Sequence, residues 1–461
     1  GTGKTIMGGL WLKESQRLGF VRRALVVCPA HLVSKWRDDW SRLLGGELRP
    51  ITAESVRHSA LDLDHDMWVV SLHLAAVNAQ VREAIHPDRA GWDAVIFDEA
   101  HRLTPSAETF YRVAEMLTTT PRTLFMTATP HRGSERLFRS LMHLVDGEVF
   151  PEVSEPSNQE PDRQLKPGPI HFLRRMKEEL VDIDGKTLLF KKRTAYNITA
   201  PLNALERSIY DEALELVDEY FPSNSVGLAK MVYGKRAASS FFGLAETLRR
   251  RIERMGAADP TIVAVDADID GDDAERDLQR VIHQQSRAER AEKRASTELR
   301  ERILAALADD DLAISKWPRL TDDIFAEHGI TTGGDEQAVV FTEFADTATW
   351  LVDRLRQYGY TAEMYSGRQT HDVRDEVRAG FMGGEFQILV STDAGNEGID
   401  LQAAHVLVNW DIPWSLVTLE QRMGRIHRVG QHRDVHLYNL VAIGTREGEA
   451  HHRLLENLVT A

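Results

Sequence analysis

The chain has 461 residues, of which 42% are apolar and 28% charged, and its formal net charge is −15. These values predict a soluble globular protein of two or three domains. They exclude a membrane protein, because no run of about 18 apolar residues occurs, and a nucleic-acid binder held by bulk positive charge. The single cysteine, Cys28, excludes an internal disulfide and favours a cytoplasmic location.

The chain opens on Gly1-Thr2-Gly3-Lys4-Thr5, which is the second half of a phosphate-binding loop. In such a loop backbone N–H groups cradle phosphates, the lysine neutralises the β and γ oxygens, and the Ser/Thr hydroxyl binds magnesium. We therefore expect these five residues to contact a nucleotide and Thr5 to bind Mg²⁺. The first glycine of the full pattern is expected upstream. A match this short also occurs by chance, so the prediction depends on residues further along the chain.

Residues 1–170 are predicted to form a doubly wound α/β domain with a parallel sheet. Short apolar runs with the character of buried strands alternate with helix-length segments such as 31–44 and 105–117. The runs cover residues 24–29, 67–72, 93–100 and 122–128. Around 145–170 the composition shifts to Pro, Glu, Ser and Gly, which predicts an exposed connection.

Residues 171–334 are predicted to form a helical insertion, because apolar residues recur at helical spacing from about residue 201 to 328. The apolar stripes are Leu205, Ile209, Ala213, Val217 and Phe221, then Leu244, Leu248 and Ile252, and on a long charged helix over 278–307 Leu278, Ile282, Leu299, Ile303 and Leu307. A basic stretch at 227–256 precedes an acidic one at 259–277. This change of sign indicates a basic surface beside an acidic loop.

Residues 335–461 are predicted to form a second α/β domain. Strand-like apolar runs return at 337–343, 361–367, 386–393, 405–410 and 435–441. The predicted fold class is therefore α/β, with two parallel-sheet lobes and a helical insertion between them.

Asp98 and Glu99 carry the strongest chemical signal. The apolar residues 94–97 form a strand that delivers both carboxylates to its carboxyl end, the edge at which parallel sheets bind ligands. Asp98 is predicted to bind magnesium and Glu99 to polarise the attacking water. The alternative is an acidic cap at a helix start, which the upstream phosphate loop disfavours.

Two further stretches complete the chemistry. Thr127 and Thr129, in TATPHRG (127–133), follow another predicted strand. They are expected to couple nucleotide hydrolysis to a change in protein conformation, and the alternative is a simple Thr-Pro turn. Arg422, Arg425 and Arg428 recur at i, i+3 spacing and are expected on one helix face. That face is either a solvated charge stripe or a source of arginine fingers for a γ-phosphate. Because the first domain shows no finger, we expect a nucleotide site shared between the two domains.

In order along the chain, these motifs resemble those of superfamily-two helicases and, among them, the Swi/Snf class of DNA-dependent ATPases. GKT, DEAH, TATP, STDAGNEGID and QRMGRIHRVGQ are similar to motifs I, II, III, V and VI, while VVCPAHLVSKW and VVFTEF resemble motifs Ia and IV. HFLRRMKEEL (171–180) and DIPWSLVTLEQ look like Swi/Snf blocks. TATPHRG is similar to the bacterial branch, which includes the polymerase-recycling ATPase RapA and phage-defence ATPases of the DISARM type.

The resemblance implies two RecA-like lobes and a role for each matching residue. Lys4, Thr5, Asp98 and Glu99 would handle nucleotide, Mg²⁺ and water, and Arg425 and Arg428 would be the fingers, with Gln421 beside the nucleotide. Gly398 and Asp400 match positions near the ribose, and Pro29, Ala30, Thr342 and Thr392 match positions that face a nucleic-acid backbone. Asn396, where a glycine is common, and Asp400, where asparagine is frequent, depart from motif V.

The function that the resemblance implies is an ATP- and Mg²⁺-dependent motor on double-stranded DNA. Contacts to phosphates carry no sequence information, so little sequence preference is expected. Other protein subunits are expected as partners, for example in an anti-phage defence system. No association with a membrane is expected. The alternatives are an RNA-polymerase-recycling ATPase, a strand-separating helicase, an ATPase-inactive scaffold subunit, and a motor that follows RNA.

Overall fold

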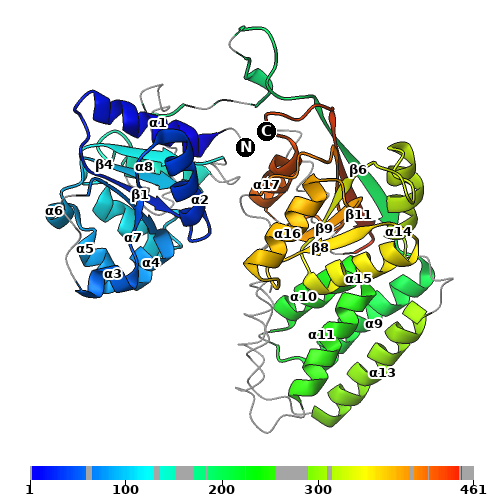
Figure 1. The fold of residues 1–461 in the computed structure, drawn as a ribbon. Helices are drawn as coiled ribbons and strands as arrows, with labels where there is room; N and C mark the ends of the chain where they lie inside the picture. The colour runs from blue at the N-terminus through cyan, green and yellow to red at the C-terminus, as the bar shows by residue number, and fades with distance from the viewer. Residues whose placement is uncertain are drawn as a thin grey trace. The chain divides into compact units, whose positions relative to one another are not determined.

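The computed structural model describes residues 3–58, 65–128, 135–151, 171–173, 175, 177–182, 184–223, 225–255, 289–308, 314–393, 399–413, 415–445 and 448. The chain divides into two compact units, Gly1–Leu180 and Val181–Ala461, each described here by itself. The ribbon in Figure 1 labels most of their helices and several of their strands. Within the described ranges no helix has the length and apolar character needed to cross a bilayer.

Unit 1 is built on a five-stranded parallel sheet with strand order β2-β3-β1-β4-β5. Its strands are β1 (Ala24–Cys28), β2 (Arg49–Pro50), β3 (Met67–Ser71), β4 (Ala94–Asp98) and β5 (Thr123–Met126). In the central register Val26 pairs with Val69 on one side and Ile96 on the other. The four apolar runs predicted as strands all form strands; β2, with two residues, carries too little pattern to be predicted.

Helices cover both faces of this sheet. They are α1 (Lys4–Arg17), α2 (Leu32–Asp39), α3 (Ala53–His58), α4 (Leu72–Val77), α5 (Ala79–Ala84), α6 (Pro87–Ala90), α7 (Glu108–Leu117) and α8 (Glu135–Val145). A π-helical turn, η1 (Trp40–Leu44), continues α2, and 3-10 turns form η2 (Ala100–Arg102) and η3 (Lys177–Glu179).

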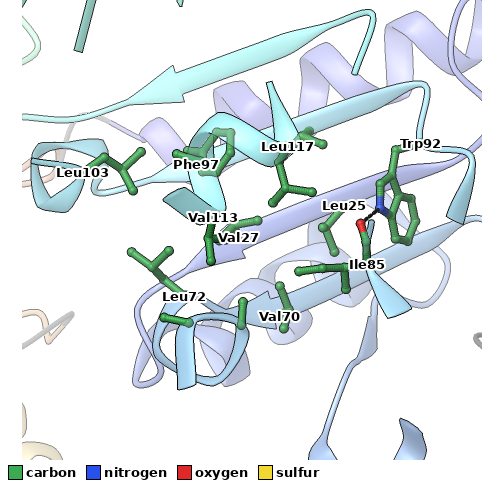
Figure 2. Packing of buried hydrophobic residues seen from close by; sticks show 14 of the residues in the cluster. Leu25, Val27, Val70, Leu72, Ile85, Trp92, Phe97, Leu103, Val113 and Leu117 are labelled. Atoms are coloured by element: carbon green, nitrogen blue, oxygen red, sulfur yellow. Dashed lines mark hydrogen bonds between the residues drawn. The ribbon is translucent and has the colours of Figure 1, made fainter. Parts of the chain in front are cut away.

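Alternation along the strands divides the side chains of unit 1 between two cores. Leu25 and Val27 of β1 enter the core beneath α4, α5 and α7. Ala24, Val26 and Cys28 enter the other core, with Trp36. Figure 2 shows the first core, where the Trp92 indole donates to the Ile85 carbonyl over 2.8 Å. Because each large apolar side chain contributes about 1.5–3 kcal/mol when buried, the two cores fix the sheet edge at which β4 and β5 end.

Unit 2 contains a six-stranded parallel sheet with strand order β6-β11-β10-β7-β9-β8. The strands are β6 (Arg193–Pro201), β7 (Ala338–Thr342), β8 (Ala362–Tyr365), β9 (Ile388–Thr392), β10 (Val406–Asn409) and β11 (Val435–Ile443), and its helices include α15 (Ala345–Gln357), α16 (His371–Met382) and α17 (Leu416–Ile426). The five predicted runs all form strands. The fold class, two parallel-sheet α/β lobes, is confirmed.

A helical layer, defined as α9 (Ala204–Tyr220), α10 (Val226–Ser239), α11 (Phe241–Arg254) and α13 (Glu289–Ala308), packs around a core of its own. Figure 1 shows these helices side by side, and all belong to unit 2. The stripes through Ile209, Leu244 and Leu299 face this core as predicted, while Leu278 and Ile282 lie outside the described residues.

Two shorter elements join the layer to the sheet. These are α14 (Lys316–Pro318) and the π-helical turn η5 (Arg319–Phe325). Strand β6 falls inside the range predicted as the insertion, yet it pairs with β11 at the sheet edge. The predicted divisions at residues 171 and 335 remain a proposal.

Candidate nucleotide site

Helix α1 begins directly after a glycine that the backbone requires. Gly3 has φ 73° and ψ 25°, a left-handed conformation that glycine adopts without strain. A Cβ at this position would meet no atom within 4 Å, so the backbone angle rather than lack of space demands glycine. Lys4 and Thr5 therefore occupy the first turn of α1, whose N–H groups lack helical partners and suit an anion. Gly1 and Thr2 lie outside the described residues.

Asp98 ends β4, and two donors hold its carboxylate. The Trp36 indole donates to Oδ2 over 2.9 Å, and the Glu99 N–H donates to Oδ1 over 2.9 Å. Asp98 is 6% exposed. Burial first, and then the adjacent Glu99 charge, raise the pKa of Asp98 above its usual range. A carboxylate in this environment gains from a nearby cation.

Glu99 is the one non-glycine residue with positive φ in the part of the chain that the structure describes. Its backbone lies at φ 50° and ψ 46°, a conformation that costs on the order of 1–3 kcal/mol and recurs at functional sites. With this backbone, the Glu99 carboxylate lies 3.9 Å from Lys4 Nζ. Residues 95 positions apart in sequence therefore meet at the carboxyl edge of the sheet.

His101 lies between the ends of β4 and β5. Its Nδ1 lies 3.1 Å from Glu99 Oε2 and 3.1 Å from Thr127 Oγ1. Burial opposes ionisation of Glu99, but the close contact with His101 and the charge of Lys4 outweigh it and lower the pKa of Glu99 to about 2. Glu99 is therefore an anion at neutral pH, and its Oε2 and the Thr127 hydroxyl both approach the same ring nitrogen of His101. Thr129, its predicted companion, lies outside the described residues.

The chemistry of these donors fits a magnesium ion. Hard oxygen donors come from Thr5 and Asp98, and the raised pKa of Asp98 means that a cation would relieve an unfavourable buried charge. Among the described residues no group of three or more His, Cys, Asp or Glu side chains would enclose a metal.

In unit 2, Arg422 on α17 points inward rather than toward solvent. It is 1% exposed and donates from Nε and Nη2 to the two carboxylate oxygens of Asp393, each over 2.6 Å. Its Nη1 donates to the Asn409 side chain and to the Asp411 carbonyl. Arg422 therefore anchors α17 to the ends of β9 and β10.

Arg425 lies in the last turn of α17, and Arg428 follows the helix. The helix ends at Ile426, so the expectation that Arg422, Arg425 and Arg428 share one helix face was wrong: Arg422 is turned into the core and Arg428 lies beyond the helix. Equal spacing in sequence does not reveal where a helix stops. Arg428 donates to the Gly424 carbonyl over 2.9 Å and to the Ile399 carbonyl over 2.6 Å. Burial lowers its pKa.

The segment predicted to lie near the ribose meets these arginines. The Leu401 N–H donates to the Arg425 carbonyl over 3.1 Å, and Asp400 Oδ1 accepts from the Gln402 N–H. Asp400, Arg425 and Arg428 thus belong to adjoining segments of unit 2. Gln421 lies on α17, and Gly398 and Asn396 lie outside the described residues.

The residues predicted to face a nucleic-acid backbone follow strand ends in both units. Pro29 and Ala30 come directly after β1, where Pro29 is buried and Ala30 exposed. Thr342 and Thr392 are partners in the register of β7 and β9, and both are fully buried. The Thr342 hydroxyl donates to Asp411. In this conformation neither threonine side chain is accessible to a ligand.

Two structural contacts at this site were not predicted from the sequence. Trp36, 62 positions before Asp98, supplies the indole that holds it. His101, inside the DEAH motif, links Glu99 to Thr127. The DEAH motif offered a signal for His101, whereas nothing in the local pattern marks Trp36.

Two known protein families match separate parts of the chain. The family described as "Type III restriction enzyme, res subunit" matches residues 1–132, and "Helicase conserved C-terminal domain" matches residues 320–430. The helicase domain of Pyrococcus furiosus Hef covers 99% of this chain and 93% of its own, with a TM-score of 0.54 and 16% identity, a likeness of fold.

Two curated relatives align over nearly the entire chain. The "Uncharacterized ATP-dependent helicase YqhH" of Bacillus subtilis is 27% identical over 97% of this chain and 72% of its own length. The "RNA polymerase-associated protein RapA" of Photobacterium profundum is 24% identical over 99% of this chain and 47% of its own. The chain thus spans about half the length of this RapA relative.

Proposed function

Because the chain belongs to the superfamily-two helicases and is an ATP-hydrolysing enzyme of that class, we propose that it is a motor that translocates along double-stranded DNA. The observation that carries the proposal is the set of contacts in unit 1 that joins Lys4, Glu99, His101 and Thr127. A strand end that carries hydrolytic chemistry is linked there to a second strand end, as coupling of hydrolysis to movement requires.

In this proposal the residues of unit 1 bind the nucleotide and orient the attacking water. Lys4 and the N–H groups of the first turn of α1 hold the ATP phosphates. Thr5 and Asp98 would hold Mg²⁺, which would supply positive charge to the phosphates. Glu99 orients the attacking water. With a pKa of about 2 it is a weak base, so orienting the water is its main role.

The residues of unit 2 would supply positive charge to the nucleotide and contacts to the nucleic-acid backbone. Arg425 and Arg428 stabilise the charge that develops on the γ-phosphate, with Gln421 beside them and Gly398 and Asp400 near the ribose. The nucleic-acid backbone would pass along the strand ends that carry Pro29, Ala30, Thr342 and Thr392. Thr127 and Thr129 would couple ATP hydrolysis to changes in these nucleic-acid contacts. Because such contacts reach phosphates alone, the motor has little sequence preference.

Triplex displacement tests this function in the intact protein. A labelled third strand on a linear duplex should be released in the presence of ATP while the duplex itself stays paired, and Glu99→Gln should abolish the release. Separation of the duplex strands would instead identify a strand-separating helicase. Equal ATPase stimulation by duplex RNA would assign the motor to RNA, and absence of turnover under all conditions would indicate a scaffold subunit.

A partner that supplies specificity is the second part of the proposal. The similarity to RapA, named as RNA polymerase-associated, favours RNA polymerase as that partner over other subunits, such as those of an anti-phage defence system in the cytoplasm. Co-purification with RNA polymerase from the native host, tested by tagging either protein, distinguishes the two. Recovery of methyltransferase or nuclease subunits instead of polymerase would favour defence.

A further inference from the structure

Asp411, in the loop that follows β10, is a point where several elements of unit 2 meet. It is 8% exposed, and its Oδ2 accepts a hydrogen bond from Ser239 of α10 over 2.8 Å and another from Thr342 at the end of β7. Its Oδ1 lies 3.3 Å from Lys316 Nζ of α14. The Asp411 carboxylate therefore contacts residues of the helical layer, of the sheet and of α14.

The main chain around Asp411 is held by the same neighbours. The Trp410 indole donates to the Ser239 carbonyl over 2.8 Å, and Lys316 Nζ donates to the Trp410 carbonyl over 2.6 Å. Trp410 is fully buried. Hydrogen bonds from side chains and from the main chain together hold this loop against α10.

The Asp411 carbonyl in turn accepts from Arg422 Nη1 over 2.6 Å. Arg422 is the residue that anchors α17 through Asp393, and α17 carries Arg425 one turn further on. A continuous set of buried hydrogen bonds thus runs from Ser239 through Asp411 and Arg422 to the helix that presents Arg425. Such contacts stabilise more in a buried environment than in water.

We propose that Asp411 is a positioning residue: it ties the helical layer to α17 and thereby fixes the direction of Arg425. The inference rests on the proposed role of Arg425 as an arginine finger. On this account the helical layer does more than fill space, because its packing against the sheet sets how well unit 2 stabilises the transition state of ATP hydrolysis.

Two neighbouring serines provide a matched test. Ser239 and Ser240 are both buried, and each hydroxyl contacts Thr347 Oγ1, at 2.9 and 2.8 Å. Ser239 bonds to Asp411, whereas Ser240 bonds to the Gly243 N–H at the start of α11. In the intact protein we expect Ser239→Ala to lower kcat for ATP about tenfold with little change in KM, and Ser240→Ala to leave kcat at the wild-type value.

A double-mutant cycle with Arg425→Ala separates positioning from stability. If Ser239 acts through Arg425, Ser239→Ala should lose its effect on kcat in the Arg425→Ala background. Equal kcat losses for the two serine variants, or an undiminished effect of Ser239→Ala beside Arg425→Ala, would overturn the inference. If Arg425→Ala itself keeps wild-type turnover, the finger role is wrong, a different failure.

A second variant covers the case in which Ser239→Ala unfolds. Lys316→Gln alters the same carboxylate from α14, and thermal unfolding of each variant shows whether the protein is folded. We expect the same selective drop in kcat and the same dependence on Arg425. A folded Lys316→Gln protein with wild-type kcat would overturn the inference as well.

Discussion

Trp36→Phe should destabilise unit 1 mainly by leaving the Asp98 carboxylate short of a donor. Trp36 is 1% exposed and its indole donates to Asp98 over 2.9 Å. A hydrogen bond to an ionised group contributes about 1.5–3 kcal/mol, and the smaller ring removes roughly 1 kcal/mol of packing. The expected loss in the free energy of unfolding is about 2.5–4 kcal/mol at pH 8.

The assay must report on unit 1 alone, because a protein with two compact units does not unfold in two states. Hydrogen exchange of the β1 and β4 amides provides that measure. Trp40→Phe is the matched control: Trp40 is equally buried in the same core, and we expect it to cost the packing contribution and part of the contact between its ring and the Lys13 ammonium, but no hydrogen bond to Asp98. In an Asp98→Asn background the loss from Trp36→Phe should shrink by about half. Strictly additive losses would refute the role of the carboxylate.

Three further outcomes are expected. Thr127→Val removes the hydroxyl 3.1 Å from His101 and should reduce ATP-driven triplex displacement more than ATP turnover; parallel losses of both would count against coupling. Arg422→Lys cannot form the paired bonds to both oxygens of the half-buried Asp393 and should destabilise unit 2 by about 1–3 kcal/mol, measured by hydrogen exchange of β9; native protection would contradict this. Burial lowers the pKa of His405 from 6.5 to about 4, so the unfolded state binds the extra proton between these values; the stability of unit 2 should fall as pH drops from 6.5 toward 4, and His405→Gln should flatten that slope when it is measured by hydrogen exchange of the β10 and β11 amides.

Strands buried on both faces were the part of the fold that the sequence predicted best. The run 94–98 is apolar until its final aspartate, and all five residues of β4 are buried. Strand β6 escaped prediction because it lies at a sheet edge with mostly exposed or half-buried side chains, such as Tyr196. Its place depends on pairing with β11, more than 200 residues later, which no local pattern encodes.

The site divides in the same way. Lys4, Asp98 and Glu99 were predicted because each combines a reactive side chain with a strand or helix end. The donors that hold them come from elsewhere: Trp36 reaches Asp98 from α2. Arg428 shows a second limit, because i, i+3 spacing predicts a shared face only while the helix continues, and α17 ends at Ile426.

The measurement that tests the central claim most directly is ATP turnover by the intact protein with and without linear duplex DNA, for the wild type and Glu99→Gln. We predict that duplex DNA stimulates the wild type. Glu99→Gln should lower kcat by about 10²-fold or more, because the attacking water is no longer oriented, while ATP still binds. Wild-type turnover by Glu99→Gln, or turnover that ignores duplex DNA, would contradict the account.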